Sequence, residues 1–299
     1  MNTLISIVGT TGIGKTALAI QLANRLKTEI ISCDSRQFFR GMEIGTAAPS
    51  AEELQQVPHH FVGQLDVQDY YSIGQFEVDA LQKLEELFKT HDQVVMVGGS
   101  MMYEKAVTEG LNDLPEANAE NLGKMQEIFE NNGYEKLLQE LQLKDEKYYN
   151  QVDKANPRRI FRALDVIWQT SEKYSDLIAE PKAVRDFEVI RIGISAPREV
   201  IYERINQRVD LMMSAGLLDE VRALLPYRHL TALKTVGYTE LFRYLDGEWT
   251  LDFAVSEIKK NSRRFAKRQL TWYRGENNIH WVDYRHAEEE SLSLLSEYV

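Results

Sequence analysis

One octapeptide near the start of the chain restricts the fold more than any other feature. Residues Gly9-Thr10-Thr11-Gly12-Ile13-Gly14-Lys15-Thr16 match the pattern G-x-x-x-x-G-K-[ST]. They follow an apolar run at residues 4–8 and lead into a helical pattern from Lys15 to Leu26, which is the context that the motif requires. The sequence therefore predicts a phosphate-binding loop (P-loop) between a strand and a helix of an α/β protein.

The residue types of this loop suit a ligand that carries linked phosphates. The glycines let backbone N–H groups turn towards phosphate oxygens, and the following helix adds the positive end of its dipole. Lys15 supplies a point charge, and Thr16 supplies a hydroxyl group that can bind Mg²⁺. We expect a ligand with two or more linked phosphates, Mg²⁺ as the cofactor and Thr16 as a metal ligand.

The chain lacks two features that are typical of many P-loop NTPases. It has no N-K-x-D guanine-binding motif, and the apolar run at residues 94–97 ends in Gly98-Gly99 rather than in the Asp of a Walker-B strand. We therefore do not expect a GTPase or a motor ATPase.

Short apolar runs alternate with helical patterns along much of the chain. Residues 4–8, 29–33, 94–97 and 191–194 have the composition of buried strands. Strands that alternate with helices indicate βαβ units and a parallel sheet. Residues 112–182, and the chain after residue 194, show helical patterns only. We predict an α/β protein with a P-loop kinase-like parallel sheet core, residues 1–111 and 183–299, and a mostly helical insertion domain, residues 112–182.

Local signals mark the beginnings of two helices. Ser72 and Gln75 have the spacing of a capping box before an apolar helix face. Asn156 can cap a helix whose first position is Pro157.

Charge and cysteine content narrow the class of protein. The chain of 299 residues has a formal net charge of -11, which opposes binding to a polyanion unless positive charge gathers locally. The single cysteine, Cys33, cannot form an internal disulfide or a multi-thiolate metal site. No stretch approaches about 18 uninterrupted apolar residues. We therefore expect a cytoplasmic protein without a membrane span.

Asp34 follows the second predicted strand. In a doubly wound sheet the carboxyl ends of neighbouring strands meet at the ligand crevice, so Asp34 and the P-loop should face one pocket. Two roles stay open: a general base for an attacking nucleophile, or a Mg²⁺ ligand. Gln37 has a donor and an acceptor edge that suit an adenine edge. His59 and His60 are consecutive and cannot easily share one ion, so a metal site is not expected there.

The order of several motifs resembles that of the tRNA dimethylallyltransferase family. After the P-loop, these motifs are Asp34-Ser35-Arg36-Gln37, Met42-Glu43-Ile44-Gly45-Thr46-Ala47, Pro58-His59-His60, Gly98-Gly99-Ser100-Met101-Met102-Tyr103, Asn156-Pro157-Arg158-Arg159-Ile160, Val236-Gly237-Tyr238 and Ala266-Lys267-Arg268-Gln269-Leu270-Thr271-Trp272. They span nearly the whole chain, so the resemblance is more specific than any single motif.

This resemblance implies that the eight P-loop residues hold the diphosphate of dimethylallyl diphosphate. It implies that Asp34 assists the N6 amine of adenine as the amine attacks the prenyl C1. The product would be i6A37, formed at adenosine 37 in the anticodon loop of tRNAs that read codons beginning with U. The segment Asp34-Ser35-Arg36-Gln37 and the insertion would contact the tRNA anticodon stem-loop. We expect the protein to act as a monomer.

Three positions carry a residue that differs from the one found in the family or in some of its members. Ser100 stands where the family usually has Thr, and it keeps the hydroxyl, so we expect a catalytic contact. Lys234 stands where some relatives carry an Arg that is thought to aid the reaction, which makes Lys234 a second catalytic candidate. Ala48 stands where the family often has Lys.

Basic residues gather in two segments that could bind RNA. Residues 259–274 hold seven basic residues and no acidic one. Helical spacing places four of them along one side: Lys260, Arg264, Lys267 and Arg268. Arg158, Arg159 and Arg162 lie in the first turns of a helix, where the dipole disfavours cations, which phosphate contacts would explain.

Arg204 and Arg208 are four residues apart and share one helix face. They could clamp the diphosphate, or they could pair with Glu199 and Glu203, and the sequence favours neither role.

Other functions remain compatible with the P-loop and Asp34. A small-molecule P-loop kinase would share both features. A prenyltransferase that acts on a free adenine nucleotide would not need the long insertion or the basic segment. A non-catalytic RNA-binding protein would tolerate replacement of Lys15.

Overall fold

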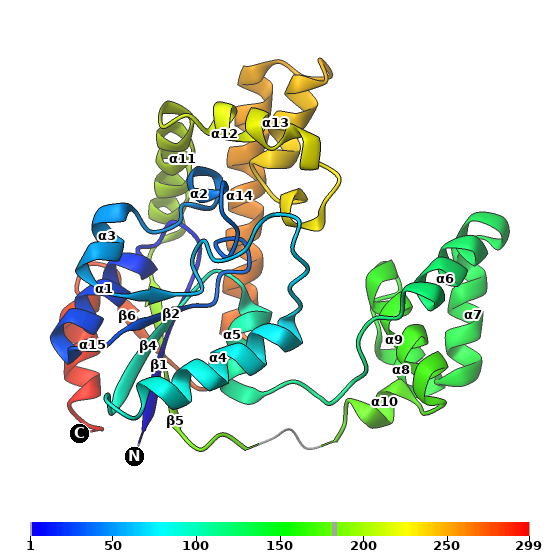
Figure 1. The fold of residues 1–299 in the computed structure, drawn as a ribbon, viewed down its shortest axis with the longest axis horizontal. Coiled ribbons are helices and arrows are strands. Elements are labelled where there is room, and N and C mark those ends of the chain that lie inside the picture. Colours follow the sequence, from blue (N-terminus) through cyan, green and yellow to red (C-terminus); the bar gives the residue numbers. More distant parts are fainter. Residues whose placement is uncertain (1, 181–183, 299) are drawn as a thin grey trace. The chain divides into compact units, whose positions relative to one another are not determined.

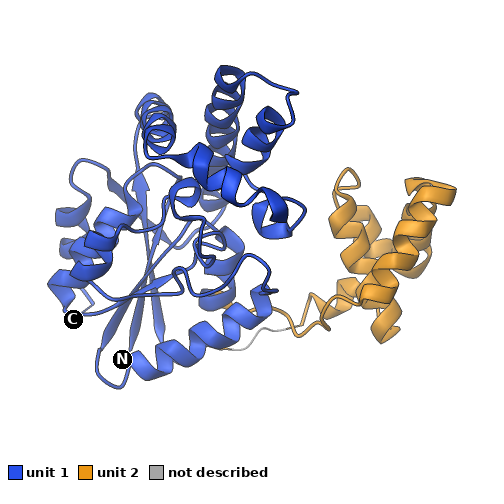
Figure 2. Cartoon of the chain, turned by 45° about the horizontal axis from the view of Figure 1, so that its top comes forward, with its two compact units in different colours: residues 1–108, 185–299 blue, residues 109–184 orange. Residues whose placement is uncertain are grey.

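The computed structural model describes residues 2–180 and 184–298, and the chain forms two compact units (Figures 1 and 2). Unit 1 comprises residues Met1–Thr108 and Arg185–Val299, and unit 2 comprises Glu109–Val184. The domain boundary predicted between residues 182 and 183 lies outside the described residues. The boundary predicted between residues 111 and 112 lies close to the start of unit 2.

Unit 1 is built on a parallel sheet in the order β3-β2-β4-β1-β5-β6. Its strands are β1 (Thr3–Val8), β2 (Ile30–Ser32), β3 (His59–His60), β4 (Gln93–Val97), β5 (Glu188–Ser195) and β6 (Ile279–Asp283). The parallel pairing confirms the predicted fold class. The expectation of helices only after residue 194 was wrong, because β6 pairs with β5 there. The sequence also gave no signal for β3.

The central strand β1 is buried on both faces. It pairs with β4 on one side and with β5 on the other, and all six of its residues are buried. Leu4 packs in one apolar core, whereas Ile5 and Ile7 pack in the other, as the twofold alternation of a strand requires. This double burial explains why residues 4–8 form a continuous apolar run in the sequence.

Helices cover both faces of the sheet (Figure 1). Helix α1 (Lys15–Leu26) packs against β1, β2 and β4, and against α3 (Ala51–Gln56) and α15 (Ala287–Leu295). Helices α4 (Ile73–Leu87) and α5 (Met101–Glu109) contribute to the core on the other face. The remaining helical segments of unit 1 are α2 (Glu43–Thr46), α11 (Arg198–Ser214), α12 (Leu217–Ala223), α13 (Tyr238–Leu245), α14 (Leu251–Arg274) and the short 3₁₀ helices Leu225–Tyr227 and Thr231–Leu233.

Unit 2 is helical and has a core of its own. Its helices are α6 (Ala119–Asn132), α7 (Tyr134–Lys144), α8 (Glu146–Gln151), α9 (Pro157–Thr170) and α10 (Tyr174–Leu177). Their apolar faces meet around the buried side chains of Met125, Leu137, Leu141, Ile160 and Leu164. A helical unit with a separate core is a segment that can fold on its own contacts.

Two predicted helix caps differ from the structure. Asn156 precedes α9, but its side chain makes no capping hydrogen bond, because the Arg159 N–H bonds to the Asn156 backbone carbonyl instead. Ser72 accepts the Gln75 N–H as predicted, whereas the Gln75 side chain donates to Asp79 and so does not complete the capping box. Within the described residues, no helix combines the length and the apolarity needed to cross a membrane.

Candidate active site

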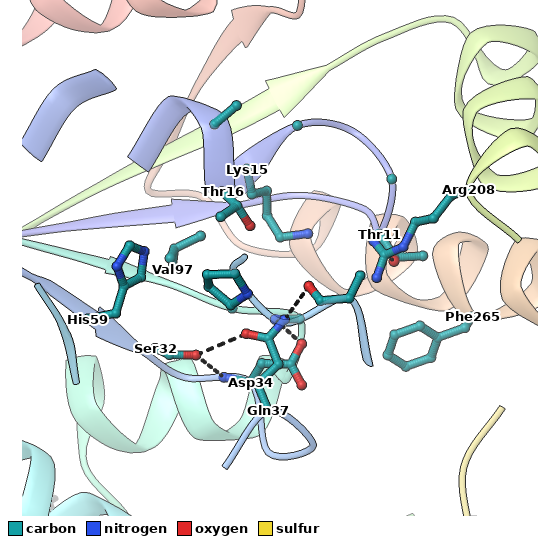
Figure 3. A pocket seen from close by; sticks show the side chains of 17 residues that line it. Thr11, Lys15, Thr16, Ser32, Asp34, Gln37, His59, Val97, Arg208 and Phe265 are labelled. Atoms are coloured by element: carbon teal, nitrogen blue, oxygen red, sulfur yellow. Dashed lines mark hydrogen bonds between the residues drawn. The ribbon is translucent and has the colours of Figure 1, made fainter. Parts of the chain in front are cut away.

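The candidate site lies at the carboxyl ends of β1, β2 and β4. The P-loop follows β1, Asp34 follows β2 and the Gly98-Gly99 turn follows β4. Together they border a pocket of about 250 Å³ (Figure 3). It is lined by Thr11, Gly12, Gly14, Lys15, Thr16, Ala17, Ser32, Asp34, Gln37, Ala47, Pro49, His59, Val97, Gly98, Gly99, Arg208 and Phe265. The predicted meeting of Asp34 with the P-loop is therefore present in the structure.

The P-loop presents the N-terminus of α1 to this pocket. Gly14 occupies the N-cap position with a φ of 110°, a left-handed conformation that disfavours residues with a Cβ. Lys15 donates through Nζ to the Thr10 carbonyl at 2.9 Å. Burial, aided by the nearby Arg208 cation, lowers the pKa of Lys15 to about 8. An anion in the pocket would favour the charged form of this lysine.

Arg204 and Arg208 of α11 contact the P-loop. Arg204 donates through Nη1 to the Ile13 carbonyl at 2.9 Å. Arg208 donates to Thr11 Oγ1 and to the Thr46 carbonyl, each at 3.2 Å, and burial lowers its pKa. Arg208 therefore lines the pocket, whereas Arg204 supports the loop beside it.

The structure does not support the alternative in which these two arginines pair with glutamates of the same helix. Among the hydrogen bonds and ion pairs of the described residues, neither arginine is joined to Glu199 or Glu203. Glu203 accepts instead from Gln207.

Asp34 is held by backbone N–H groups on both carboxylate oxygens. Oδ1 accepts from the Arg36 N–H at 3.1 Å, and Oδ2 accepts from the Gly99 N–H at 3.2 Å. Gly99 approaches closely because it lacks a side chain: a Cβ there would lie 2.7 Å from Asp34 Oδ2. The carboxylate faces the same pocket as Lys15, which is compatible with either predicted role.

The segment 34–37 is also held by its other side chains. Ser35 donates its N–H to Ser100 Oγ at 3.0 Å, and the two hydroxyl oxygens lie 2.9 Å apart. Arg36 donates to the Thr231 and Ala232 carbonyls. Ser100 is not among the pocket-lining residues of the described chain; it supports the segment that carries Asp34.

The Gln37 amide is already engaged within the protein. Its Nε2 donates to the Thr46 carbonyl at 3.3 Å and to the Ala47 carbonyl at 3.0 Å, and its Oε1 accepts from Ser32 Oγ at 3.3 Å. Gln37 lines the pocket, but donation from its Nε2 to an adenine edge would replace one of these hydrogen bonds.

The predicted basic helix exists as part of α14, and its charges divide between two sides. Lys259 pairs with Asp210, and Arg263 donates to Asn206 at 2.6 Å, both on α11. The four predicted tRNA-binding residues follow a different pattern. Arg264, Lys267 and Arg268 are exposed, and the partly buried Lys260 pairs with Glu257. Lys234 is exposed and lies outside the residues that line the pocket.

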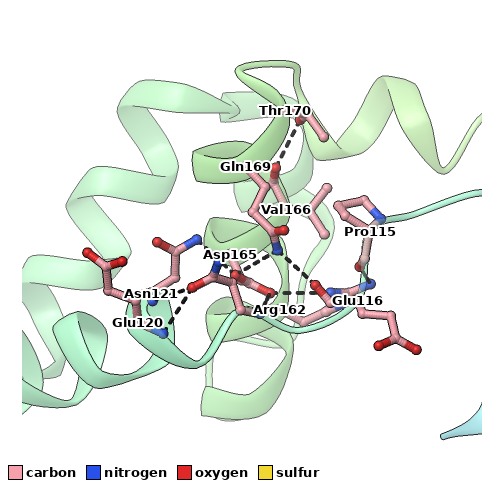
Figure 4. A network of polar contacts seen from close by, with 10 residues as sticks. Pro115, Glu116, Glu120, Asn121, Arg162, Asp165, Val166, Gln169 and Thr170 are labelled. Atoms are coloured by element: carbon pink, nitrogen blue, oxygen red, sulfur yellow. Dashed lines mark hydrogen bonds and ion pairs between the residues drawn. The ribbon is translucent and has the colours of Figure 1, made fainter.

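The basic residues of α9 differ in their surroundings, and Figure 4 shows those of Arg162. Arg158 and Arg159 are exposed in the first turn. Arg162 donates to Asp165 at 3.3 Å and to the Pro115 carbonyl at 2.6 Å, so it is committed to the internal structure of unit 2. Contact with tRNA stays a prediction for all three residues.

Three residues that belong to the site were not among the predicted site residues. Phe265 and His59 line the pocket. Burial lowers the pKa of His59, and its buried Nε2 has no hydrogen-bond partner in the described chain. Gln269 joins the P-loop to the Gly98-Gly99 turn, with hydrogen bonds of 2.8 Å on each side. Neither β3, the short edge strand that contains His59, nor the position of Gln269 had a local signal in the sequence.

The pocket also holds oxygen atoms that suit Mg²⁺. The Thr16 hydroxyl and the Asp34 carboxylate both border it, and Mg²⁺ prefers such oxygen ligands together with substrate phosphates and water. The described residues contain no group of three or more His, Cys, Asp or Glu side chains arranged to hold a metal ion. A Mg²⁺ ion here would therefore depend on phosphate oxygens for part of its coordination.

Known proteins match this chain over nearly its whole length. The profile of the IPP transferase family matches residues 37–276. A curated tRNA dimethylallyltransferase of Christiangramia forsetii is 49% identical over 298 residues, covering 100% of this chain and 97% of that protein. The tRNA dimethylallyltransferase 1 of Bacteroides thetaiotaomicron is 47% identical over 294 residues, covering 98% and 94%.

Solved structures extend the comparison to the fold. The full-length tRNA isopentenylpyrophosphate transferase of Bacillus halodurans has a TM-score of 0.73 at 34% identity, covering 99% of this chain and 96% of that one. A eukaryotic dimethylallyltransferase acting on tRNA has a TM-score of 0.83 at 24% identity, covering 95% and 74%. This second likeness concerns the fold alone.

Proposed function

The chain belongs to the IPP transferase family, and we propose that it transfers the dimethylallyl group from dimethylallyl diphosphate to N6 of adenosine 37 in tRNA. The product is i6A37, in tRNAs that read codons beginning with U. Mg²⁺ as cofactor, action as a monomer and a cytoplasmic location are parts of the same proposal. The observation that carries it is one pocket bordered by both the P-loop and the Asp34 carboxylate.

The P-loop side of the pocket receives the diphosphate. Backbone N–H groups at the start of α1, the Lys15 ammonium and the Arg208 guanidinium supply positive charge around it. Negative charge grows on the leaving diphosphate as the bond to the prenyl C1 breaks, and fixed donors stabilise that charge most in the transition state. When bound, Mg²⁺ would add to this neutralisation from the side of Thr16.

The Asp34 side of the pocket receives the adenine amine. The lone pair of an exocyclic amine is delocalised into the ring, so the amine gains from a base that accepts its proton as the new C–N bond forms. Asp34 is fixed by two backbone N–H groups and faces the pocket. It can therefore take that proton without first having to be reoriented.

An adenine inside an anticodon loop reaches such a pocket only when it leaves its stack. Phe265 lines the pocket and offers an aromatic face for a displaced base. The exposed cations Arg264, Lys267 and Arg268 lie on the same helix, α14. Their charge would attract RNA phosphates although the net charge of the chain is -11.

The test is transfer of a labelled dimethylallyl group from its diphosphate to an unmodified tRNA with the sequence A36-A37-A38. We expect incorporation that disappears with an A37→G transcript and with the Lys15→Ala variant. Omission of Mg²⁺ should lower the rate. Transfer of phosphate from ATP to a small acceptor, without prenyl incorporation, would instead identify a P-loop kinase.

A further inference from the structure

Gln269 of α14 connects the two sides of the pocket through one side-chain amide. The residue is fully buried. Its Oε1 accepts the Thr11 N–H at 2.8 Å, and its Nε2 donates to the Gly99 carbonyl at 2.8 Å. The amide therefore fixes the P-loop against the turn that follows β4.

Gly99 extends this connection to Asp34. The Gly99 N–H donates to Asp34 Oδ2 at 3.2 Å while the Gly99 carbonyl accepts from Gln269. A Cβ on Gly99 would lie 2.7 Å from Asp34 Oδ2 and 3.5 Å from Gln269 Nε2. Contacts thus run without a gap from Thr11 through Gln269 and Gly99 to the carboxylate.

Packing alone does not account for a glutamine at this position. Ala266 and Tyr273, three residues before and four residues after Gln269, lie on the same helix face and are buried. An apolar side chain of similar length would fill this space, whereas a buried amide is costly unless its polar atoms are bonded. Both ends of the Gln269 amide find backbone partners at the active site, and this explains its presence.

We propose that Gln269 is a positioning residue for prenyl transfer: it sets the distance between the diphosphate-binding loop and the Asp34 carboxylate. The leaving group and the base must be held at once around the reacting C1, and misplacement by about 1 Å can cost on the order of 100-fold in rate. Gln269 touches neither reactant in this role and acts through Thr11 and Gly99. The inference rests on the proposed function.

The first test compares Gln269→Met, which keeps the length and removes both hydrogen bonds, with Thr28→Val. Thr28 is a buried residue of unit 1 whose hydroxyl donates to the Gln93 carbonyl, and it does not line the pocket. With saturating substrates, we expect Gln269→Met to lower the single-turnover rate constant about 10- to 100-fold, with the Kd for inorganic diphosphate within about threefold. Thr28→Val should leave both values near wild type. Equal effects of the two variants on the rate would overturn the proposal.

A double-mutant cycle separates positioning from a general loss of structure. In an Asp34→Ala background, Gln269→Met should lower the remaining rate by no more than about twofold, because the group that it positions is absent. A loss as large as that in the wild-type background would mean that Gln269 does not act through Asp34.

Hydrogen exchange gives a readout that does not require turnover. Binding of inorganic diphosphate should slow exchange of the Gly99 amide in the wild-type protein and not in Gln269→Met. If diphosphate leaves the exchange rate of the Gly99 amide unchanged in the wild-type protein, the proposed coupling of the P-loop to Gly99 through Gln269 is wrong. Absence of prenyl transfer by the wild-type protein would instead defeat the proposed function, while the exchange result would still decide the coupling.

Discussion

Asp34 of unit 1 and Asp165 of unit 2 are two carboxylates in contrasting surroundings. Asp165 is fully buried and accepts hydrogen bonds from four residues, and Figure 4 shows the network around it. These donors are Asn118, Asn121, Arg162 and Gln169. Asp34 accepts two backbone N–H groups and otherwise faces a pocket. A carboxylate with all its acceptor positions filled maintains structure, whereas one with a side left open can take part in chemistry.

The strongest test of this contrast is Asp34→Asn. The amide is isosteric but cannot accept a proton from adenine, so we expect single-turnover prenyl transfer to fall roughly 1,000-fold. The Kd for dimethylallyl diphosphate, measured by calorimetry, should stay within about threefold. Weakened binding of both diphosphate and Mg²⁺ would assign Asp34 the role of metal ligand instead.

Asp165→Ala should act on stability rather than on the reaction. It leaves the Arg162 guanidinium and two side-chain amides without their shared acceptor, at a cost of about 3 kcal/mol. Hydrogen exchange should rise in the amides of α6 and α9, while the Kd for inorganic diphosphate stays unchanged. Faster exchange in β1 or α1 to the same extent would show that the two units do not respond separately.

The charge of Lys15 should respond to a bound ligand because Lys15 borders the pocket. The cluster around Asp165 differs, since its hydrogen bonds are already made within the protein. Its pKa is lowered to about 8 in the free protein, and a bound diphosphate favours the protonated form, so binding raises that pKa. Affinity for inorganic diphosphate should therefore be highest below pH 8 and fall by up to about tenfold per pH unit above it.

The matched control for this pH dependence is Lys15→Arg, whose guanidinium stays charged throughout the range. Dividing the two profiles removes the titration of diphosphate itself. Profiles that remain parallel from pH 7 to pH 9.5 would exclude titration of Lys15 as the cause.

The smallest effect is expected at Ser100, which supports Asp34 indirectly. Ser100→Ala removes the acceptor of the Ser35 N–H, and loss of one such hydrogen bond should slow transfer by roughly 3- to 10-fold. Ser100→Thr keeps the hydroxyl and should stay near the wild-type rate. A loss with Ser100→Ala as large as that with Asp34→Asn would place the Ser100 hydroxyl in the reaction itself.

The sequence predicted central elements of the fold better than peripheral ones. Helix α1 has the predicted bounds Lys15–Leu26, because the P-loop motif determines where it begins. Strands β1 and β4 are buried on both faces and therefore appear as continuous apolar runs. Strands β3 and β6 lie at the two edges of the sheet and are only partly buried, so neither carries a continuous apolar pattern.

The sequence predicted those site residues whose position is determined by the end of a strand. Asp34 and the P-loop follow β2 and β1, two strands of one parallel sheet that are separated only by β4, and their meeting follows from this topology. Gln269 contacts residues that are 258 and 170 positions away in the sequence. Helical spacing gives the face on which such a residue lies, but it does not give the partner that the face meets. For the same reason the contact of Arg162 with the Pro115 carbonyl was not anticipated, whereas its contact with Asp165, three residues further along α9, is a local one that helical spacing allows.

The insertion of unit 2 between β4 and β5 has a consequence for synthesis on the ribosome. Strand β1 pairs with β4 on one edge and with β5 on the other, and β5 is translated only after all of unit 2. At roughly 5 to 20 residues per second, the β5 edge of β1 stays unpaired for about 5 to 20 s after β4 is made. An exposed strand edge invites pairing with other chains. The nascent N-terminal segment, rather than the finished protein, is therefore the species most exposed to aggregation.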